Sequence, residues 1–207
     1  MIVLVFCIMK LYHGSVSIVN MPEYGVGNHK NDYGLGFYCT EHIELAKEWA
    51  CFSGNDGFVN CYNLGLEGLA VFDLTRCHIL NWMAILLENR TFDLSAGLSS
   101  VAKDYILETF LPDYKRYDVI RGYRADDSYF SFAKDFLNNT ISIEDLSEAM
   151  KLGKLGEQVV LKSQRAFNAL SFETSLPVDS SVYYLKWKRR DQIARNDYKV
   201  IKEKSNP

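Results

Sequence analysis

Strand-like and helical segments follow one another along this chain without a regular alternation. Runs rich in β-branched and aromatic residues predict strands at residues 2–13, 36–39, 58–64, 69–74, 117–123, 157–162 and 182–187. Apolar residues at helical spacing predict helices at residues 41–54, 79–87, 105–111, 129–136, 142–152 and 164–170. Scattered strands with interposed helices are typical of an α+β fold, whereas a parallel α/β sheet requires regular βα units.

Polar residues and glycines set the expected ends of the early elements. Thr40 is expected to cap the helix that ends near Gly54. The strands at 58–64 and 69–74 are separated by Gly65 to Gly68, and this short glycine-bounded connection predicts a hairpin or meander.

Similar signals occur in the second half of the chain. Ser142 opens a capping box for a helix that Gly153 and Gly156 are expected to end. Asp126 and Asp127 form an acidic pair that suits either metal or acid–base chemistry, or the capping of the helix that follows. We favour capping, because aspartate at a helix start is common without any ligand.

The length and composition of the chain predict one main domain. Its 207 residues are 48% apolar and 14% aromatic, which is enough to form an ordinary core. We expect a single domain over residues 9–187, followed by a basic C-terminal tail at 188–207. Residues 1–8 form an N-terminal extension if Met9 is the true start, or the beginning of the first strand if it is not.

The charge of the chain is unevenly distributed, although the total is only −3. From Lys186 to Lys204 there are eight Lys and Arg against three Asp and Glu, a local charge of +5. Such a segment is able to contact nucleic acid or an acidic protein. The alternative, which we favour, is a solvated terminal helix.

Cysteine, histidine and hydrophobic patterns exclude several classes of protein. The five cysteines are scattered and never spaced C-x-x-C, so they predict buried thiols in a reducing cytoplasm, without a disulfide framework or zinc knuckle. Four dispersed histidines predict no metal site. No run approaches the ~20 apolar residues of a membrane helix. P-loop, dinucleotide-fingerprint and H-E-x-x-H motifs are also absent.

Two short motifs combine the residue types that a nicotinamide pocket needs. His13-Gly14 ends the first expected strand, and Gly36-Phe37-Tyr38 opens the second. A tyrosine ring can stack on cationic nicotinamide, and a glycine allows the backbone to approach the carboxamide closely. An adjacent imidazole can bond a ribose hydroxyl.

These motifs and four others together resemble the bacterial DUF3990 family, a family of unknown function placed in the ADP-ribosyltransferase superfamily. The segments that carry the resemblance are Leu11 to Ser15, Asp32 to Thr40, Ala46 to Ala50, Tyr117 to Gly122, Ala125 to Asp127 and Glu157 to Val159. The resemblance extends from Met9 to about Phe172, and its His-Gly and Gly-Phe-Tyr elements are similar to the His-Tyr branch, which includes poly-ADP-ribose polymerases and diphtheria-type toxins. It implies a split antiparallel β-sheet with flanking helices.

The resemblance also implies an NAD-binding cleft. In it, His13 bonds the nicotinamide-side ribose, the Gly14 backbone holds the carboxamide and Tyr38 stacks on the nicotinamide ring. Trp49 is the nearest aromatic residue to the second tyrosine of that branch. The remaining binding residues implied by the same motifs are Ser15, Gly36 and Thr40.

The resemblance also implies a catalytic position on the late strand, which either Gln158 or Glu157 would hold. Consecutive side chains on a strand point to opposite faces, so only one of the two can face the cleft. A carboxylate stabilises an oxocarbenium ion better than an amide does. The family pattern favours Gln158, and loss of the branch's glutamate is associated with transfer of single ADP-ribose units.

The implied function is NAD-dependent mono-ADP-ribosylation of a protein or nucleic acid, without a metal. Small bacterial members of this superfamily often act as toxins in toxin–antitoxin or phage-defence systems, so a cognate antitoxin is an expected partner. We expect the loop from Val16 to Tyr33 and the basic tail to select the acceptor.

Two other functions fit the same residues. Without a catalytic carboxylate the pocket becomes a module that senses NAD or ADP-ribose. An RNA 2'-phosphotransferase has a related fold but requires several basic residues in the cleft, for which Arg121 and Arg124 are the mid-chain candidates.

Overall fold

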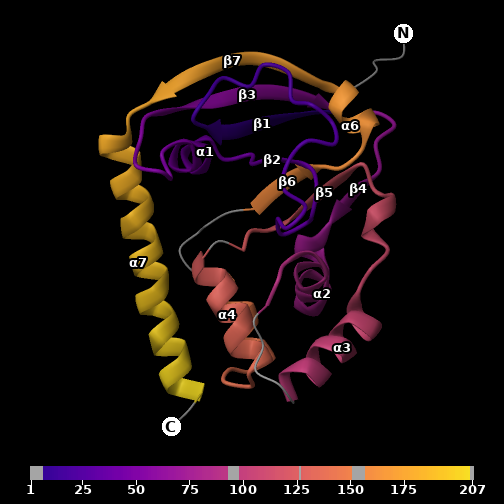
Figure 1. Ribbon diagram of the computed structural model, residues 1–207, viewed down its shortest axis with the longest axis vertical. Helices are drawn as coiled ribbons and strands as arrows, with labels where there is room; N and C mark the ends of the chain where they lie inside the picture. The colour runs from indigo at the N-terminus through magenta and orange to yellow at the C-terminus, as the bar shows by residue number, and fades with distance from the viewer. Residues whose placement is uncertain (1–6, 93–97, 126, 151–156, 206–207) are drawn as a thin grey trace.

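The computed structural model describes residues 7–92, 98–125, 127–150 and 157–205, which form a mixed α+β fold with seven α-helices and two β-sheets. The predicted fold class is therefore confirmed at this level. Figure 1 shows the three-stranded sheet across the top of the molecule, the four-stranded sheet below it and a group of helices at the base. The helices are α1 (Ile43–Ala50), α2 (Ile79–Asn89), α3 (Leu98–Phe110), α4 (Asp127–Leu137), α5 (Ile143–Ala149), α6 (Gln164–Asn168) and α7 (Ser180–Ser205).

The upper sheet is antiparallel and has the order β1-β3-β7. Its strands are β1 (Ile8–Ser15), β3 (Gly57–Gly65) and β7 (Leu170–Val178). One face of this sheet packs on α1 through a small apolar cluster that includes Ala46, Ala50 and Val59. Because β7 is an edge strand, it tolerates Pro177, which has no N–H for a further neighbour.

The lower sheet has the order β2-β6-β5-β4. Its strands are β2 (Phe37–Cys39), β6 (Glu157–Leu161), β5 (Val119–Tyr123) and β4 (Val71–Asp73). The β2–β6 and β6–β5 pairs are antiparallel, whereas β5 and β4 are parallel. A continuous apolar cluster fills the space between the two sheets, with Leu11, Tyr62 and Val159 all fully buried.

Within the described ranges, an isolated backbone bridge joins the two sheets. The backbone of Tyr12 in β1 exchanges hydrogen bonds of 2.8 and 2.9 Å with that of Thr40, directly after β2. Beyond this bridge the two strands pair with different partners, β1 with β3 and β2 with β6. Residues near the bridge therefore lie where the two sheets separate.

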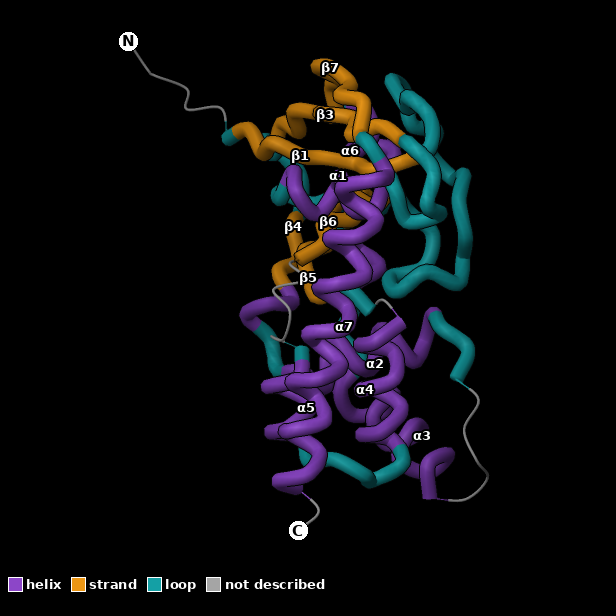
Figure 2. The backbone as a smooth tube through the Cα atoms, turned by 90° about the vertical axis from the view of Figure 1, so that its left-hand side faces the viewer, coloured by secondary structure: helices purple, strands orange, loops and turns teal. Residues whose placement is uncertain are grey.

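The lower part of the molecule is helical. In Figure 2 the strands lie in the upper half, and helices make up most of the lower half. The largest apolar cluster lies here and combines residues of α2, α4, α5 and the lower sheet, with Trp82, Met83 and Phe132 almost fully buried. Helix α7 spans both parts, since it contacts α1 near the upper sheet and α4 and α5 below.

Two predictions about the early elements are wrong. The strand at 69–74 does not form a hairpin with 58–64, because β4 pairs in parallel with β5 in the other sheet. Thr40 does not cap α1, whose N-cap residue is His42. The Thr40 hydroxyl instead accepts the His42 N–H at 3.2 Å and donates to the Glu157 carbonyl at 3.0 Å, so it links β2 to β6.

The C-terminal prediction is also wrong at one point. Residues 182–187 are not a strand but part of α7, which continues without a break through the boundary expected at residue 187. The basic segment is accordingly helical, as the favoured interpretation of the tail required. The strand β7 was not predicted at all.

Other expected features are confirmed or lie outside the described residues. The capping box of α5 is present, with the Ser142 hydroxyl accepting the Asp145 N–H at 3.1 Å. Strand β1 forms as predicted, although most of the residue 1–8 extension lies outside the described part of the chain. The same holds for Gly153 and Gly156, and for the capping roles of the Asp126 and Asp127 side chains.

Candidate functional site

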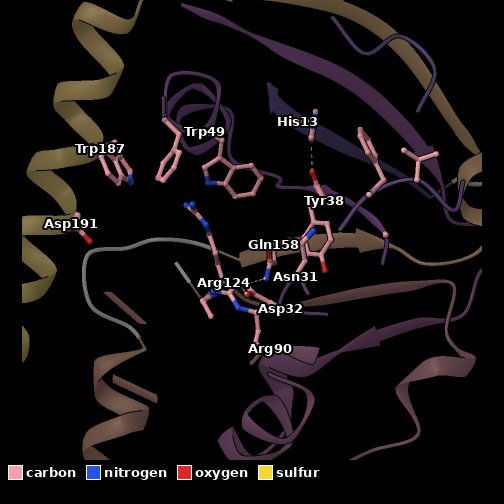
Figure 3. Close-up of a pocket in the computed structure, with 16 residues that line it drawn as sticks. His13, Asn31, Asp32, Tyr38, Trp49, Arg90, Arg124, Gln158, Trp187 and Asp191 are labelled. Atoms are coloured by element: carbon pink, nitrogen blue, oxygen red, sulfur yellow. Dashed lines mark hydrogen bonds and ion pairs between the residues drawn. The ribbon is translucent and has the colours of Figure 1, made fainter. Parts of the chain in front are cut away.

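A cavity of about 480 Å³ lies where the two sheets separate, and α1 and α7 close its far side (Figure 3). It brings together segments that are far apart in the sequence. The lining residues are His13, Val26, Gly27, Asn31, Asp32, Gly36, Phe37, Tyr38, Trp49, Phe52, Arg90, Arg124, Ala125, Gln158, Trp187 and Asp191. Five of these were predicted as site residues: His13, Gly36, Tyr38, Trp49 and Gln158.

His13 is the first residue of β1 beyond the bridge between the sheets. Its Nδ1 lies 2.7 Å from the Tyr38 carbonyl oxygen, and its ring packs against Phe37 at 4.5 Å between centroids. Because a carbonyl oxygen only accepts, Nδ1 carries the proton of this bond. Burial lowers the pKa of the imidazole, which favours a neutral ring whose Nε2 is an acceptor.

Tyr38 lies in β2 with its ring on the cavity wall. Its hydroxyl donates to the Gly34 carbonyl at 2.6 Å and accepts the Tyr33 N–H at 3.1 Å, which fixes the ring orientation. Burial raises the pKa of this phenol, so the hydroxyl stays protonated at neutral pH. The side chain can therefore offer a fixed, neutral aromatic face.

Asp32 and Gln158 form a buried polar pair at the base of the cavity. The Gln158 side-chain nitrogen donates to Asp32 Oδ2 at 3.0 Å and to the Tyr123 carbonyl at 3.2 Å. Asp32 also accepts the Ala125 N–H at 2.8 Å and is paired through Oδ1 with Arg90 at 3.1 Å. Burial raises the pKa of this carboxyl, while the hydrogen bonds and arginines oppose the rise.

Glu157 points away from this cavity, as strand alternation requires. Its carboxylate pairs with Arg121 at 2.5 Å, and Arg121 also contacts Glu41 at 3.1 Å. Neither Glu157 nor Arg121 lines the cavity. The structure thus places Gln158, and not its neighbour, next to the other site residues.

Trp49 and Arg124 form the wall on the α1 side. The Arg124 guanidinium lies over the Trp49 ring at 4.9 Å from the centroid. The buried Trp49 indole nitrogen has no hydrogen-bond partner among the described residues. A buried donor of this kind costs free energy unless a ligand or water satisfies it.

The far end of the cavity is formed by the end of α1 and by α7. Phe52 packs edge to face on Trp187 at 4.9 Å between centroids, and Trp187 stacks on Tyr184 at 5.7 Å. One turn along α7, Asp191 also lines the cavity, and its carboxylate accepts the Arg195 Nε–H at 2.8 Å.

The other predicted binding residues lie near the cavity without lining it. Gly14 faces α1, since a Cβ atom there would lie 2.0 Å from the Ala46 carbonyl oxygen. Ser15 donates to the Ser17 carbonyl at 2.6 Å in the turn after β1, and Thr40 bonds the Glu157 carbonyl. Their geometry is that of residues which shape the backbone around the site.

Among the cavity residues that were not singled out from the sequence, four bear on its chemistry: Asp32, Arg90, Trp187 and Asp191. Asp32 directly precedes the Tyr33-Gly34 turn of the quoted motif, so its position carried a signal. The other three come from the end of α2 and from α7, and only tertiary packing brings them to the cavity. Among the described residues, no group of three or more His, Cys, Asp or Glu is arranged to hold a metal ion.

The fold and cavity define an α+β protein with a pocket that combines aromatic, imidazole, amide and carboxylate groups. The model of the DUF3990 family, described as a protein of unknown function, matches residues 9–172. The chain belongs to this family. No match was found among curated proteins or among solved structures. No helix in the described ranges is long and apolar enough to cross a membrane.

Proposed function

We propose that this protein binds NAD in the cavity and transfers a single ADP-ribose unit to a macromolecular acceptor. The observation that carries the proposal is the convergence of His13, Tyr38 and the Asp32–Gln158 pair on one cavity. The ADP-ribosyltransferase-like split sheet implied by the sequence resemblance is part of this proposal. The separation of β1 and β2 beyond the Tyr12–Thr40 bridge supports it.

His13 and Tyr38 would hold the nicotinamide riboside part of NAD. The neutral imidazole has Nδ1–H bonded to the Tyr38 carbonyl, which leaves Nε2 to accept a hydrogen bond from a ribose hydroxyl. The fixed Tyr38 ring would stack on the cationic nicotinamide. Trp49 would form the opposite wall of this part of the pocket.

Asp32 and Gln158 would act on the bond that breaks. Cleavage of the C1'–N bond leaves its electron pair on nicotinamide and positive charge on the ribose, and the acceptor nucleophile then bonds C1' and loses its proton. Gln158 would orient the ribose, and the Asp32 carboxylate, 3.0 Å from the amide nitrogen, would stabilise the developing charge. Gln158, the β6 residue that lines the cavity, has no carboxylate. Asp32 would supply that carboxylate from the neighbouring loop.

We further propose that the protein works in the cytoplasm as a toxin restrained by an antitoxin. Growth arrest on expression of the chain, relieved by Asp32→Asn, is the expected result in a bacterial host. Unimpaired growth at high expression would contradict the toxin role.

The test of the donor site compares ring and carboxylate variants of the full chain. Tyr38→Ala should weaken NAD binding by more than about tenfold in calorimetry, whereas Tyr38→Phe retains the ring and should bind nearly normally. Asp32→Asn should retain NAD binding but lower nicotinamide release by about 100-fold. Circular dichroism checks that each variant is folded.

The outcomes separate the proposed functions. NAD turnover with transfer of labelled ADP-ribose to a lysate component supports the transferase. Tight NAD binding without any nicotinamide release would instead identify a sensing module. Normal binding by Tyr38→Ala would show that the assigned pocket is wrong. A 2'-phosphotransferase is not favoured, because it requires several basic residues in the cleft. Of the two predicted candidates, Arg124 lines the cavity but Arg121 lies outside it, and Arg90 is paired with Asp32.

A further inference from the structure

The α7 end of the cavity differs in chemistry from the end that holds His13 and Tyr38. Here the wall is aromatic, with Phe52 and Tyr184 each in contact with Trp187. Phe52 leaves 49% of its surface exposed, so an apolar ring is available to a ligand. Aromatic side chains grouped in this way provide a stacking surface for flat, conjugated rings.

Charged groups flank this aromatic surface. Lys188 lies over the Tyr184 ring at 4.4 Å, and Arg195 pairs with Asp191 at the cavity wall. Positions 184, 188, 191 and 195 are three or four residues apart, so they share one side of α7. Figure 3 shows Trp187 and Asp191 on the side of α7 that borders the cavity. Two cations therefore accompany the aromatic surface along this side of α7.

The location of these residues in the sequence is also informative. The groups proposed to hold NAD lie within the residues that match the family model, 9–172. Trp187 and Asp191 lie beyond it, on α7, yet they line the same cavity. The proposed NAD-binding residues lie within the matched region. The α7 residues outside it are therefore assigned to the second substrate, the acceptor.

From these three observations we propose that the α7 end of the cavity receives a nucleobase of a single-stranded nucleic acid, the acceptor in the proposed transfer. The base stacks against Trp187 and Phe52, and its edge meets the Asp191 carboxylate. Lys188 and Arg195 contact phosphates of the same strand. That the nucleic acid is the acceptor rests on the proposed function. That it binds at this end of the cavity does not.

The charges favour a nucleic acid over a protein acceptor. Within the cavity a basic peptide side chain would meet Arg124, and an acidic one would meet the Asp191 carboxylate. A nucleobase is neutral, stacks on aromatic rings and brings phosphates that match the surrounding cations. A single strand is required because the base has to leave its stack to enter the cavity.

The first experiment measures binding of a labelled mixed-sequence oligonucleotide of about 12 nucleotides by fluorescence anisotropy, without NAD. Trp187→Ala should weaken binding by about 5- to 150-fold, the loss expected for one stacked base. Trp187→Phe keeps an aromatic ring and should recover most of the affinity. If both variants bind as tightly as the unaltered chain, the proposal is wrong.

The second experiment uses neighbouring residues as matched variants. Lys188→Ala should weaken binding and reduce the dependence of log affinity on log salt by about 0.7, the value for one phosphate contact to a single strand. Arg189→Ala removes the same charge from the adjacent position, which points to the opposite side of α7 from Trp187 and is exposed. If both changes weaken oligonucleotide binding equally, the strand does not follow the Lys188 side of α7 and the proposal is wrong.

Two competing occupants give different results. If the adenine of NAD fills this end, Trp187→Ala will weaken NAD binding but not nicotinamide mononucleotide binding, and oligonucleotide binding will not change. If the acceptor is a protein, label from NAD in a lysate will resist nuclease and be released by protease. Either result overturns the proposal. Failure of the proposed function alone would show as oligonucleotide binding that depends on Trp187 without any NAD binding.

Discussion

At the scale of single residues, the key side chains of the candidate site are held in place by hydrogen bonds to backbone carbonyl groups. The ring of His13 bonds the carbonyl of Tyr38, and the hydroxyl of Tyr38 bonds the carbonyl of Gly34. Each side chain is thus oriented by a backbone atom of the β2 region. The two groups proposed to hold the nicotinamide riboside are therefore fixed before any ligand binds.

The protonation state of His13 leads to a pH prediction. Its lowered pKa means that the ring is neutral at pH 7 and gains a proton only below ~6.5, the ordinary imidazole value. NAD binding should be constant above that value and fall as the pH decreases below it, because a protonated Nε2 cannot accept from ribose. The measurement is the NAD dissociation constant between about pH 5 and 8, in the range of native stability.

His13→Asn removes the titrating group and provides the comparison. This variant should bind NAD more weakly than the unaltered chain but without the acidic fall, apart from any contribution of Asp32. An unchanged pH profile in His13→Asn would assign the titration to another residue.

At the scale of elements, the crossing of β1 and α1 determines where the cavity can form. Gly14 has no side chain, so the α1 backbone lies directly against β1, and a Cβ atom at this position would be 2.0 Å from the Ala46 carbonyl oxygen and 2.8 Å from Trp49 Cβ. Trp49, on the adjacent turn of α1, is thereby held beside β1. The glycine thus contributes to the site through packing.

Gly14→Ala should therefore destabilise the fold. The overlap involves backbone atoms that cannot move independently, so we expect a loss of about 3 kcal/mol in the free energy of unfolding measured in urea. Gly65→Ala is the matched control at the end of β3, where the nearest atom to a Cβ would be 3.9 Å away. That change should alter stability by less than about 0.5 kcal/mol. Similar losses in both variants would contradict this explanation.

The elements also show how far the sequence predicts the structure. Local signals were sufficient for β1, β6 and the capping box of α5, because strand composition and cap residues act within a few positions. The parallel pairing of β4 with β5 joins Val71 to Val119, which lies far away along the chain, so no local pattern contains it.

The start of α7 was misassigned because Val182, Tyr183 and Tyr184 have strong strand propensity. A longer window contains the helical signal, since the inward positions Trp187, Ala194, Tyr198 and Ile201 follow one another at spacings of seven, four and three. Tertiary packing of these side chains outweighs the local propensity.

The candidate site was predicted only in part, because local motifs identify some of its residues and tertiary packing brings in the others. His13 and Tyr38 were identified by short motifs that carry a chemical meaning, and Gln158 by the family resemblance. Arg90 and Trp187 were not, because they lie at the end of α2 and on α7 and reach the cavity only through the arrangement of helices around the sheets. Arg90 follows a buried apolar helix and Trp187 lies in a polar one, and neither setting marks a binding residue.

At the scale of the whole molecule, α7 connects the upper sheet layer with the helical base. In its first half, Arg190 pairs with Glu48 of α1 at 2.7 Å, and both side chains are largely buried. Near its end, Tyr198 and Lys202 both bond Asp135 of α4, at 2.7 and 3.0 Å. The two parts of the molecule should therefore unfold together.

The buried pair between α7 and α1 gives the last prediction. Glu48→Gln leaves the Arg190 guanidinium facing a neutral amide in a largely buried position, and should lower the free energy of unfolding by about 2 kcal/mol. Glu44→Gln is the matched control on the same helix, because Glu44 forms exposed ion pairs with Lys47 and Lys186 and should cost less than about 0.5 kcal/mol. Urea unfolding followed by tryptophan fluorescence and by far-ultraviolet circular dichroism measures both. We expect the two probes to give coincident transitions in each variant, because α7 joins both layers. A larger loss of stability in Glu44→Gln than in Glu48→Gln would contradict this role of α7. Separate transitions in the unaltered chain would contradict it as well.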